Sequence, residues 1–331
     1  MIETPLESAS SSSNTHENFA NRKVAVLVPC YNEESTIPLV VRDFKASLPG
    51  ARVYVYDNNS TDRTTEVARD AGAIVRSEPR VGKGNVVRRM FADIEADIYV
   101  LVDGDDTYHA ASASSLIQHL LNHQLDMVNA SRTSQAEKAY RFGHRFGNRT
   151  LTALVGFIFE KQFSDMLSGY RVFSRRFVKS FPALSTGFEI ETELTVHALE
   201  LRMPVGEVET PYKERPEDSE SKLHTYKDGF QILKTIGILV KQEKPLLFFS
   251  TIAGLLVAAS IWTGWPIVME FLNTGLVPRF PTAILASALM ILAFLSFSSG
   301  LILDTVTHGR REMKRLNYLT IAGPAELTQT K

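Results

Sequence analysis

Two hydrophobic periodicities alternate along residues 23–212 of the 331-residue chain. Short apolar runs such as VAVLVPCY, VYVYD and IYVLVD are typical of buried strands. Apolar residues three or four positions apart predict the helices between them, over 34–48, 61–72, 82–96 and about 112–123. Further short strands are expected at 73–78 and 125–132. Regular strand–helix alternation predicts an α/β fold with a doubly wound, mainly parallel sheet.

The helix over 61–72 carries its own boundary signals. Thr61 or Ser60 is the expected N-cap, because a side-chain oxygen there can accept a hydrogen bond from a free backbone N–H. Gly72 is the expected stop, since glycine readily adopts the left-handed conformation that ends helices.

Two long stretches near the C-terminus contain no charged residue. They run over 245–269 and 280–303, and each is long enough for the roughly 20 apolar residues that span a bilayer. The pattern favours a transmembrane hairpin over a pair of buried core helices, because globular helices usually have about 8–20 residues. We expect a hairpin over 245–307.

Flanking charge orients the hairpin. Four lysines precede the first stretch, and four basic residues follow the second: Lys227, Lys234, Lys241 and Lys244, then Arg310, Arg311, Lys314 and Arg315. Basic flanks favour the cytosolic side of an inner, plasma or ER-type membrane, which places the preceding domain in the cytosol. The small residues Gly254, Ala258 and Ala259 permit close helix contact and therefore a homo-oligomer.

The rest of the chain divides by composition. Composition predicts a disordered polar tail over residues 1–22 and the α/β domain over residues 23–224. It predicts a basic cytosolic tail over residues 308–331. Residues 225–244 place apolar positions and a lysine stripe on different helical faces, which predicts an amphipathic interfacial helix rather than an ordinary surface helix.

Overall charge and cysteine content exclude some classes. The chain has 36 Lys and Arg against 37 Asp and Glu, so bulk charge does not favour nucleic acid. The single cysteine, Cys30, cannot form an internal disulfide and is expected to be a small buried residue in a reducing compartment.

A carboxylate cluster follows the strand that ends near residue 103. Asp103, Asp105 and Asp106 repel one another unless a cation or water offsets their charge. Hard carboxylate oxygens suit Mg²⁺ or Mn²⁺, which suggests that Asp103 and Asp105 hold a metal bound to a diphosphate. Asp106 alternatively caps the next helix. The carboxylate spacing does not match an EF-hand loop, and the segment RVGKGN at 80–85 lacks the long glycine loop and the Lys-Ser/Thr ending of a P-loop.

Polar residues also follow two neighbouring strands. Asn32 and Glu33 come after the first strand, and Asp57 and Asn59 come after the second. Ligands bind beyond the carboxyl ends of strands in open α/β sheets, so these residues and the Asp103 turn should share one crevice.

Four motifs in order, VLVPCYNEEST, VYDNNSTDRT, GKGNVVRRM and VDGDDTY, resemble family 2 glycosyltransferases with the GT-A fold. In particular the chain looks like polyprenyl-phosphate glycosyltransferases related to dolichyl-phosphate mannose synthase. The resemblance covers residues 23–224 by motif and extends to about 310 by architecture. It implies nucleotide-sugar binding by Pro29, Tyr31, Asn32, Glu33, Asp57, Asn59, Ser60, Lys83, Gly84, Gly104, Glu189 and Glu191.

The same resemblance implies an acceptor-phosphate site. Its expected residues are Arg132, Arg145, Arg171, Arg215, Ser221 and Lys222. The predicted catalytic set is Asp103, Asp105, Arg132, Arg145, Arg215 and Lys222. Thr107 stands where the family often supplies a further metal ligand. The third metal ligand could therefore be water or Asp106.

The expected reaction is inverting, metal-dependent transfer of a hexosyl group from a UDP- or GDP-sugar to a polyprenyl or dolichyl phosphate at the cytosolic membrane face. A phosphate monoester has a second pKa near 6, so this nucleophile needs no strong general base. Alternatives are a processive polysaccharide synthase, a non-catalytic membrane-anchored nucleotide-sugar-binding protein and a nucleotidyltransferase. A processive synthase would carry a Gln-x-x-Arg-Trp motif. This chain lacks that motif, because both tryptophans, Trp262 and Trp265, lie in the apolar stretch at 245–269.

Overall fold

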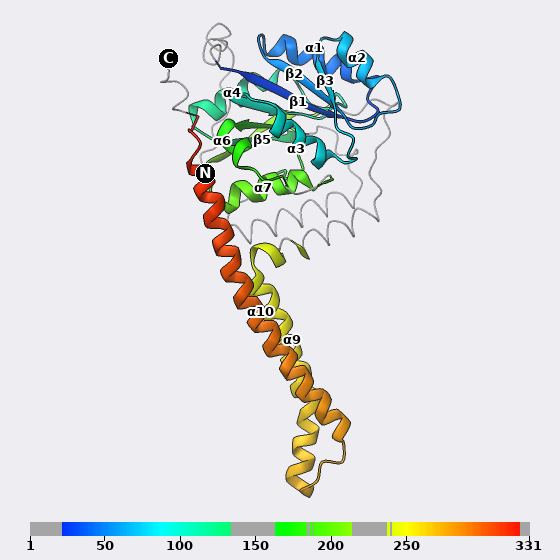
Figure 1. The fold of residues 1–331 in the computed structure, drawn as a ribbon, viewed down its shortest axis with the longest axis vertical. Coiled ribbons are helices and arrows are strands. Elements are labelled where there is room, and N and C mark those ends of the chain that lie inside the picture. The colour runs from blue at the N-terminus through cyan, green and yellow to red at the C-terminus, as the bar shows by residue number, and fades with distance from the viewer. Residues whose placement is uncertain are drawn as a thin grey trace. The chain divides into compact units, whose positions relative to one another are not determined.

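One seven-stranded sheet organises the N-terminal part of the protein (Figure 1). The computed structural model describes residues 22–133, 163–183, 186–187, 189–213, 237–238 and 240–324. The strands, in order across the sheet, are β3 (Ile74–Ser77), β2 (Arg52–Asp57), β1 (Val24–Cys30), β4 (Ile98–Leu101), β6 (Arg171–Ser174), β5 (Met127–Thr133) and β7 (Val205–Pro211). Only β6 runs antiparallel to its neighbours among these strands, which confirms the mainly parallel sheet.

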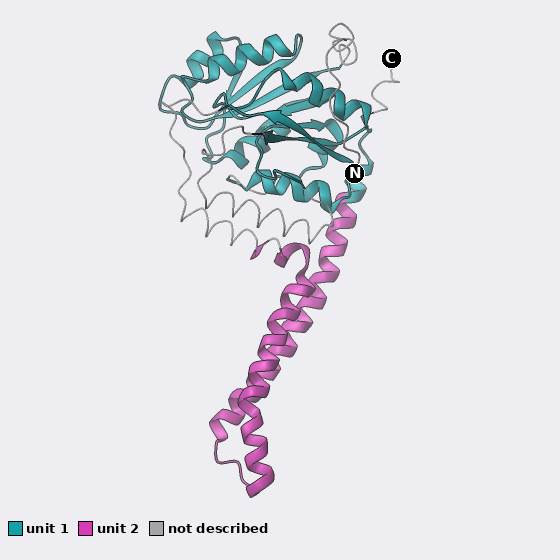
Figure 2. Ribbon diagram, turned by 180° about the vertical axis from the view of Figure 1, so that it is seen from behind, with its two compact units in different colours: residues 1–225, 315–331 teal, residues 226–314 magenta. Residues whose placement is uncertain are grey.

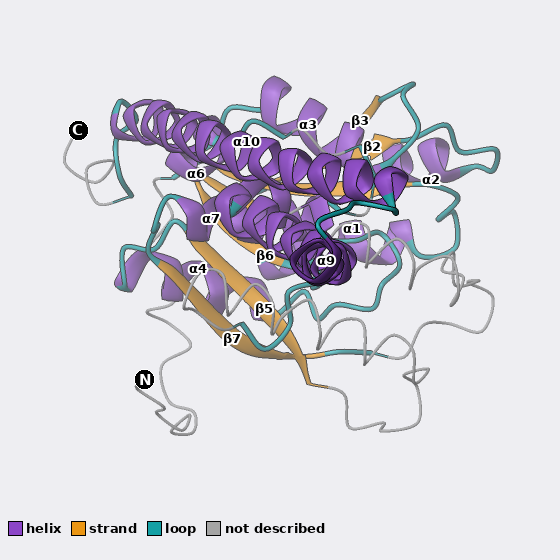
Figure 3. Cartoon of the chain, turned by 90° about the horizontal axis from the view of Figure 1, so that it is seen from below, coloured by secondary structure: helices purple, strands orange, loops and turns teal. Residues whose placement is uncertain are grey.

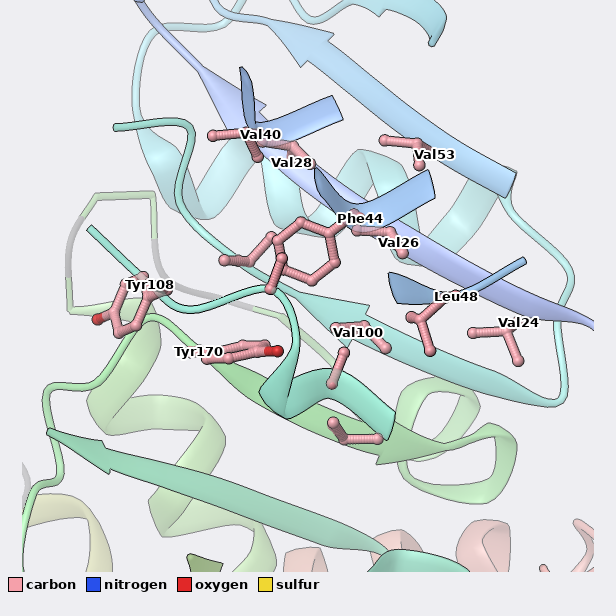
Figure 4. Packing of buried hydrophobic residues seen from close by; sticks show 14 of the residues in the cluster. Val24, Val26, Val28, Val40, Phe44, Leu48, Val53, Val100, Tyr108 and Tyr170 are labelled. Carbon is pink, nitrogen blue, oxygen red and sulfur yellow. The ribbon is translucent and has the colours of Figure 1, made fainter. Parts of the chain in front are cut away.

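Helices cover both faces of this sheet. They are α1 (Ile37–Ser47), α2 (Thr64–Asp70), α3 (Lys83–Asp93), α4 (Ser112–Asn122), α6 (Arg175–Ser180) and α7 (Ile190–Glu200). Alternate residues of β1 point to opposite faces, so Val26 and Val28 join one core while the side chains between them face the other. This core includes Phe44 of α1, whose ring meets Tyr170 edge-on at 6.0 Å (Figure 4).

A phenylalanine cluster fills the opposite face. Phe91 of α3 packs edge-on against Phe173 of β6, with ring centroids 5.9 Å apart, and Phe173 stacks on Phe177 of α6 at 4.6 Å. Apolar residues on both faces of the strands are what a doubly wound sheet requires, and this explains their continuous hydrophobic sequence.

The predicted cap of α2 is wrong, whereas its predicted stop is confirmed. The helix begins at Thr64, three residues after Thr61, because the Asp62 carboxylate accepts hydrogen bonds from both the backbone N–H and the hydroxyl of Thr64. At the other end Gly72 has φ +89°, the left-handed conformation expected after a helix.

Strand direction and register place the carboxyl ends of six strands, all except β6, at one edge. Cys30 at the end of β1 lies opposite Asp57 at the end of β2, and β4 is parallel to β1. Because β6 is antiparallel to both β4 and β5, β5 and its parallel neighbour β7 also end at this edge. Figure 3 shows β5, β6 and β7 together at one end of the sheet. The edge defined by these ends is called the carboxyl edge below.

The chain forms two compact units (Figure 2). The first contains residues 1–225 and 315–331, and the second contains residues 226–314. The second unit includes α9 (Pro245–Thr274) and most of α10 (Phe280–Leu319). Both helices are long and apolar enough to cross a membrane, with mean hydropathies of 2.0 and 2.1. They are therefore candidate spans, as the uncharged stretches predict.

Polar contacts join the two long helices. The Ser260 hydroxyl donates to the carbonyl of Ala286 at 2.7 Å, and the Ser296 hydroxyl donates to the carbonyl of Phe249 at 3.1 Å. Near the start of α9, the buried Glu243 carboxylate pairs with Arg310 and Arg311 at 3.0 Å each. Of the predicted interfacial helix, residues 225–236 and 239 lie outside the described residues.

The second long helix does not give way to a tail at residue 308. Helix α10 continues to Leu319, because the charged segment REMKRL still consists of good helix formers. Residues from 315 onward belong to the first unit. Residues 308–319 therefore continue the helix instead of forming a tail, and residues 315–324 belong to the unit of the α/β domain.

A buried aspartate holds this C-terminal segment. Asp126 precedes β5, at the edge opposite the carboxyl edge, and is 0% exposed. Its carboxylate accepts hydrogen bonds from Arg176, from Ser174 at 2.7 Å and from the Tyr318 hydroxyl at 2.7 Å. The Arg176 guanidinium also lies over the Tyr318 ring, 4.3 Å from its centroid. These contacts form the C-terminal clasp, defined as Asp126, Ser174, Arg176 and Tyr318.

Replacing Tyr318 by phenylalanine tests the clasp. The change removes one donor from a buried carboxylate, so local opening should become about 1–2 kcal/mol easier, roughly 5–30-fold. We expect trypsin cleavage near Arg315 to accelerate by that factor under conditions where cleavage follows the open population. The exposed Leu319→Ala is the matched control and should cleave at the wild-type rate. Equal rates for both variants would contradict the clasp.

Candidate active site

The turn after β4 carries the predicted metal carboxylates. Asp103 is partly accessible, with 29% of its side chain exposed, whereas Asp105 is buried. Asp105 Oδ1 accepts hydrogen bonds from the Thr107 hydroxyl at 2.6 Å and from the Thr107 backbone N–H at 3.3 Å. Thr107 thus orients Asp105 here rather than acting as a separate acceptor.

Asp106 faces another partner. Its carboxylate pairs with Lys213 at 3.3 Å, and its φ of +54° turns the chain away from the strand direction. Helix α4 begins at Ser112 with Ala111 as its N-cap, so the interpretation of Asp106 as a helix cap is wrong. The bridge between Tyr108 and Tyr212 and the bond from the Lys213 N–H to the Thr107 carbonyl hold the same turn against the end of β7.

Lys83 lies between two carboxylates. Its ammonium, on a side chain 10% exposed, is 2.5 Å from Asp103 Oδ1 and 2.5 Å from Glu191 Oε1. Lys83 opens α3 and Glu191 lies in the first turn of α7, so two helix starts and the β4 turn meet at one charge. The second oxygen of Glu191, Oε2, is buried and has no hydrogen-bond partner within the described residues.

This cluster keeps the lysine charged. Burial by itself lowers the pKa of Lys83, but the charges and hydrogen bonds of Asp103 and Glu191 outweigh it and raise the pKa above its usual value. The ammonium therefore remains a fixed positive charge beside Asp103 at neutral pH.

The loops after β1 and β2 hold each other. The Asn32 backbone N–H donates to the Ser60 hydroxyl at 2.9 Å, and the Asn32 side chain accepts from the Thr61 N–H at 2.8 Å. The Asp57 carboxylate is buried and accepts from the Ser60 N–H. Asn32 and Asn59 both have positive φ, of +52° and +65°, a conformation that asparagine tolerates better than most residues.

Other residues predicted to bind the nucleotide sugar border these loops. Pro29 is half-buried at the end of β1, Tyr31 is exposed, and the Glu33 N–H donates to the Thr64 hydroxyl at 2.8 Å. The Asn59 amide donates to the Pro79 carbonyl at 2.9 Å, which fixes the chain leading to α3.

Gly84 and Gly104, the two glycines predicted to bind the nucleotide sugar, lie in these segments. Gly84 is buried in the first turn of α3. Gly104 lies against Cys30, so a Cβ there would come 2.7 Å from the Cys30 sulfur. Glu189, at the start of α7, turns back to accept from the Gly187 N–H at 3.3 Å, away from the bonds that Glu191 makes.

Arg132 reaches the same edge from the end of β5. Its guanidinium forms a two-point pair with Asp165, at 2.6 Å from Nε to Oδ2 and 2.9 Å from Nη2 to Oδ1. The Tyr212 ring lies over the guanidinium, 5.4 Å from its centroid. The structure therefore brings Arg132 to the carboxyl edge together with Asp57, Asp103 and Asp105.

Arg171 corrects the predicted acceptor site. It is 0% exposed, and its guanidinium donates to the carbonyls of Met166 and Ser168 and to the Thr195 hydroxyl. As a residue of β6 it points into the sheet's α7-covered face rather than to the edge. It therefore supports residues 163–170, called the 163–170 loop below, and presents no surface to a phosphate.

Four predicted residues lie outside the part of the chain that the structure describes: Arg145, Arg215, Ser221 and Lys222. Conversely, sequence reasoning missed Asp165 and Gly169 in the 163–170 loop. The only signal for them is their place in SDMLSGYR, immediately before the arginine that was singled out.

Within the described residues, no group of three or more His, Cys, Asp or Glu is placed to hold a metal ion unaided. The β4 turn instead supplies two hard carboxylates, from Asp103 and Asp105. Mg²⁺ commonly binds through one or two carboxylates together with substrate phosphates and water. The residues present therefore fit a divalent ion held jointly with a phosphorylated ligand.

Comparison with known proteins agrees with this geometry. Residues 25–181 match the family model described as Glycosyl transferase family 2. Glycosyltransferase AglJ of Haloferax volcanii is 32% identical over 304 residues, which are 89% of this chain and 98% of the relative. A dolichyl-phosphate hexose transferase of the same organism is 28% identical over 223 residues, covering 67% of this chain and 95% of the relative.

The fold also matches a solved glycosyltransferase. Glucosyl-3-phosphoglycerate synthase from Mycobacterium tuberculosis, in complex with Mn²⁺, UDP-glucose and glycerol 3-phosphate, superimposes with a TM-score of 0.59 at 22% identity. The match covers 72% of this chain and 86% of that structure, and it shows the fold. Together with AglJ and the family model, it confirms the resemblance seen in the motifs: the chain belongs to glycosyl transferase family 2 and is a glycosyltransferase with the GT-A fold.

Proposed function

We propose that this glycosyltransferase moves a hexosyl group from a UDP- or GDP-sugar to the phosphate of a polyprenyl phosphate, with inversion, at the cytosolic face of a membrane. The observation that carries the proposal is the meeting, at one sheet edge, of a carboxylate turn and an oriented arginine. Asp103 and Asp105 suit the diphosphate of a donor through a metal, and Arg132 suits the phosphate of an acceptor.

The donor side requires charge compensation. A bound Mg²⁺ or Mn²⁺ supplies charge stabilisation of the departing diphosphate. Asp103 and Asp105 would hold it, and the solved relative with Mn²⁺ and UDP-glucose supports this choice. Lys83 contributes a permanent positive charge beside Asp103, while Asp57 and the loops of Asn32 and Ser60 border the space proposed for the nucleoside.

The acceptor side requires orientation rather than proton removal. A phosphate monoester is largely dianionic at pH 7 and is already a competent nucleophile. Its attacking oxygen must be held in line with the sugar carbon, which is the role proposed for Arg132. The relative that is a dolichyl-phosphate hexose transferase supports a lipid-linked phosphate as acceptor.

The candidate spans are consistent with a lipid acceptor. A polyprenyl phosphate keeps its apolar chain in the bilayer and its phosphate at the surface. We propose that α9 and α10 insert in the membrane and keep the enzyme where this phosphate is found.

Incubating the purified full-length protein with polyprenyl phosphate, Mn²⁺ and a panel of labelled UDP- and GDP-hexoses tests the function. One donor should label the lipid fraction, EDTA should abolish labelling, and added Mn²⁺ or Mg²⁺ should restore it. Asp103→Asn should lower the rate at least about 100-fold, because it removes a carboxylate that would hold the metal and so weakens the stabilisation of the departing diphosphate. Asp93→Asn, which breaks a surface pair with Arg89, should stay within about threefold of wild type.

The same experiment can refute the lipid acceptor without refuting the glycosyltransferase activity. Label that enters only a water-soluble phosphorylated acceptor, such as a phosphoglycerate, would refute the lipid acceptor. Full activity of Asp103→Asn would refute the metal site.

Gly169→Ala tests whether Asp103 must keep its position. A Cβ at Gly169 would come 2.8 Å from the Asp103 carboxyl carbon, so the carboxylate must move. A displacement of about 1 Å can cost roughly 100-fold in rate, and we expect a loss of 10- to 100-fold with unchanged circular dichroism. Gly309→Ala, where a Cβ meets no atom within 4 Å, is the control and should retain full transfer activity. Unchanged activity of Gly169→Ala would show that the position of Asp103 is not critical.

A further inference from the structure

The 163–170 loop connects the two halves of the proposed site. At one end Asp165 pairs with Arg132 through both carboxylate oxygens. At the other end the Gly169 N–H donates to the Tyr108 hydroxyl at 2.8 Å, and Gly169 lies against Asp103. A single short segment therefore contacts both the residue proposed for the acceptor phosphate and a residue proposed for the metal.

Asp165 is itself held from two strands. Its backbone carbonyl accepts from the Asn129 amide of β5 at 2.7 Å, and its backbone N–H donates to Glu207 of β7 at 3.3 Å. Glu207 also accepts from the Asn129 amide at 2.8 Å and from the Ser164 N–H at 2.8 Å. Asn129 and Glu207 are direct neighbours in the sheet register, so the rigid sheet fixes where the Asp165 carboxylate lies.

Buried Arg171 secures the middle of the loop. Its guanidinium donates to the Ser168 carbonyl at 3.0 Å and to the Met166 carbonyl. Three polar side chains of the sheet, from Asn129, Arg171 and Glu207, thus hold the backbone of a loop that has no regular secondary structure of its own.

Two contacts then define the plane of the Arg132 guanidinium. The Asp165 carboxylate lies along its Nε–Nη2 side, and the Tyr212 ring lies over its face. An arginine recognises phosphate through the direction of its planar N–H groups, so an arginine held in one orientation loses less freedom on binding. Asp165 also cancels part of the guanidinium charge, so its contribution is orientation and not attraction.

We propose that Asp165 is a positioning residue that orients Arg132 for the phosphate of the acceptor. This inference rests on the proposed function and adds to it a residue that does not touch the reacting atoms. It predicts that Asp165 affects binding of the acceptor phosphate and does not affect binding of the nucleotide-sugar donor.

Asp165→Asn in the full-length enzyme is the test. An asparagine oxygen can accept from one guanidinium N–H, but its NH₂ group repels the other, so the two-point pair is lost. We expect the KM for polyprenyl phosphate to rise about tenfold or more, while the KM for the nucleotide sugar changes less than about twofold. Arg132→Gln should raise the acceptor KM similarly, and adding Asp165→Asn to Arg132→Gln should then have little further effect.

Asp126→Asn is the matched control. It breaks another buried, two-point arginine pair, with Arg176, at the opposite edge of the sheet. This variant should lose stability and keep the wild-type acceptor KM. If Asp126→Asn and Asp165→Asn lower stability alike and neither changes the acceptor KM, Asp165 is only structural and the inference is wrong.

The two proposals fail in different ways. A wild-type enzyme that labels no lipid acceptor refutes the proposed function. A wild-type enzyme that labels the lipid, with an unchanged acceptor KM in Asp165→Asn, refutes only the role of Asp165. Additive effects of Asp165→Asn and Arg132→Gln also refute that role, because they would place the two residues in independent interactions.

Discussion

The pairing of charge at the carboxyl edge is the constraint on which the site depends. Parallel strands bring acidic residues together there, and buried like charges are unfavourable unless a cation lies between them. Lys83 is the cation between Asp103 and Glu191. Arg132 is the cation that pairs with Asp165. Each pair joins segments that are far apart in sequence, so the same contacts that balance the charge also assemble the edge.

Periodicity allowed much of this arrangement to be predicted. Alternating strands and helices imply a parallel sheet, and a parallel sheet implies that Asp57 and Asp103 end at the same edge. The pairing of Lys83 with Glu191 was beyond such reasoning, because the two residues are 108 positions apart and meet only after α3 and α7 have packed. The start of α2 was misplaced for a local reason: the Asp62 carboxylate, and not a side chain of Thr61 or Ser60, accepts the N–H of Thr64, where the helix begins.

Arg171 illustrates a more general difficulty. In the sequence it is one of several arginines near phosphate-like motifs, and a guanidinium fits carbonyl oxygens as readily as phosphate oxygens. Its side chain alternates with that of Val172 along β6, so it points to the α7-covered face and donates to Thr195, and burial there lowers its pKa although nearby acids oppose the effect. The face to which Arg171 points, which the short apolar run VFS does not reveal, decides between a binding and a structural arginine.

The C-terminal clasp has a consequence for the order in which the protein is made. Asp126 is synthesised early, but Tyr318, one of the donors to its buried carboxylate, follows both long apolar helices in the chain. The hairpin is thus an insertion within the catalytic domain and not an appendage to it. Because domains generally begin to fold during synthesis, this domain reaches its final packing only after the ribosome has produced both candidate spans.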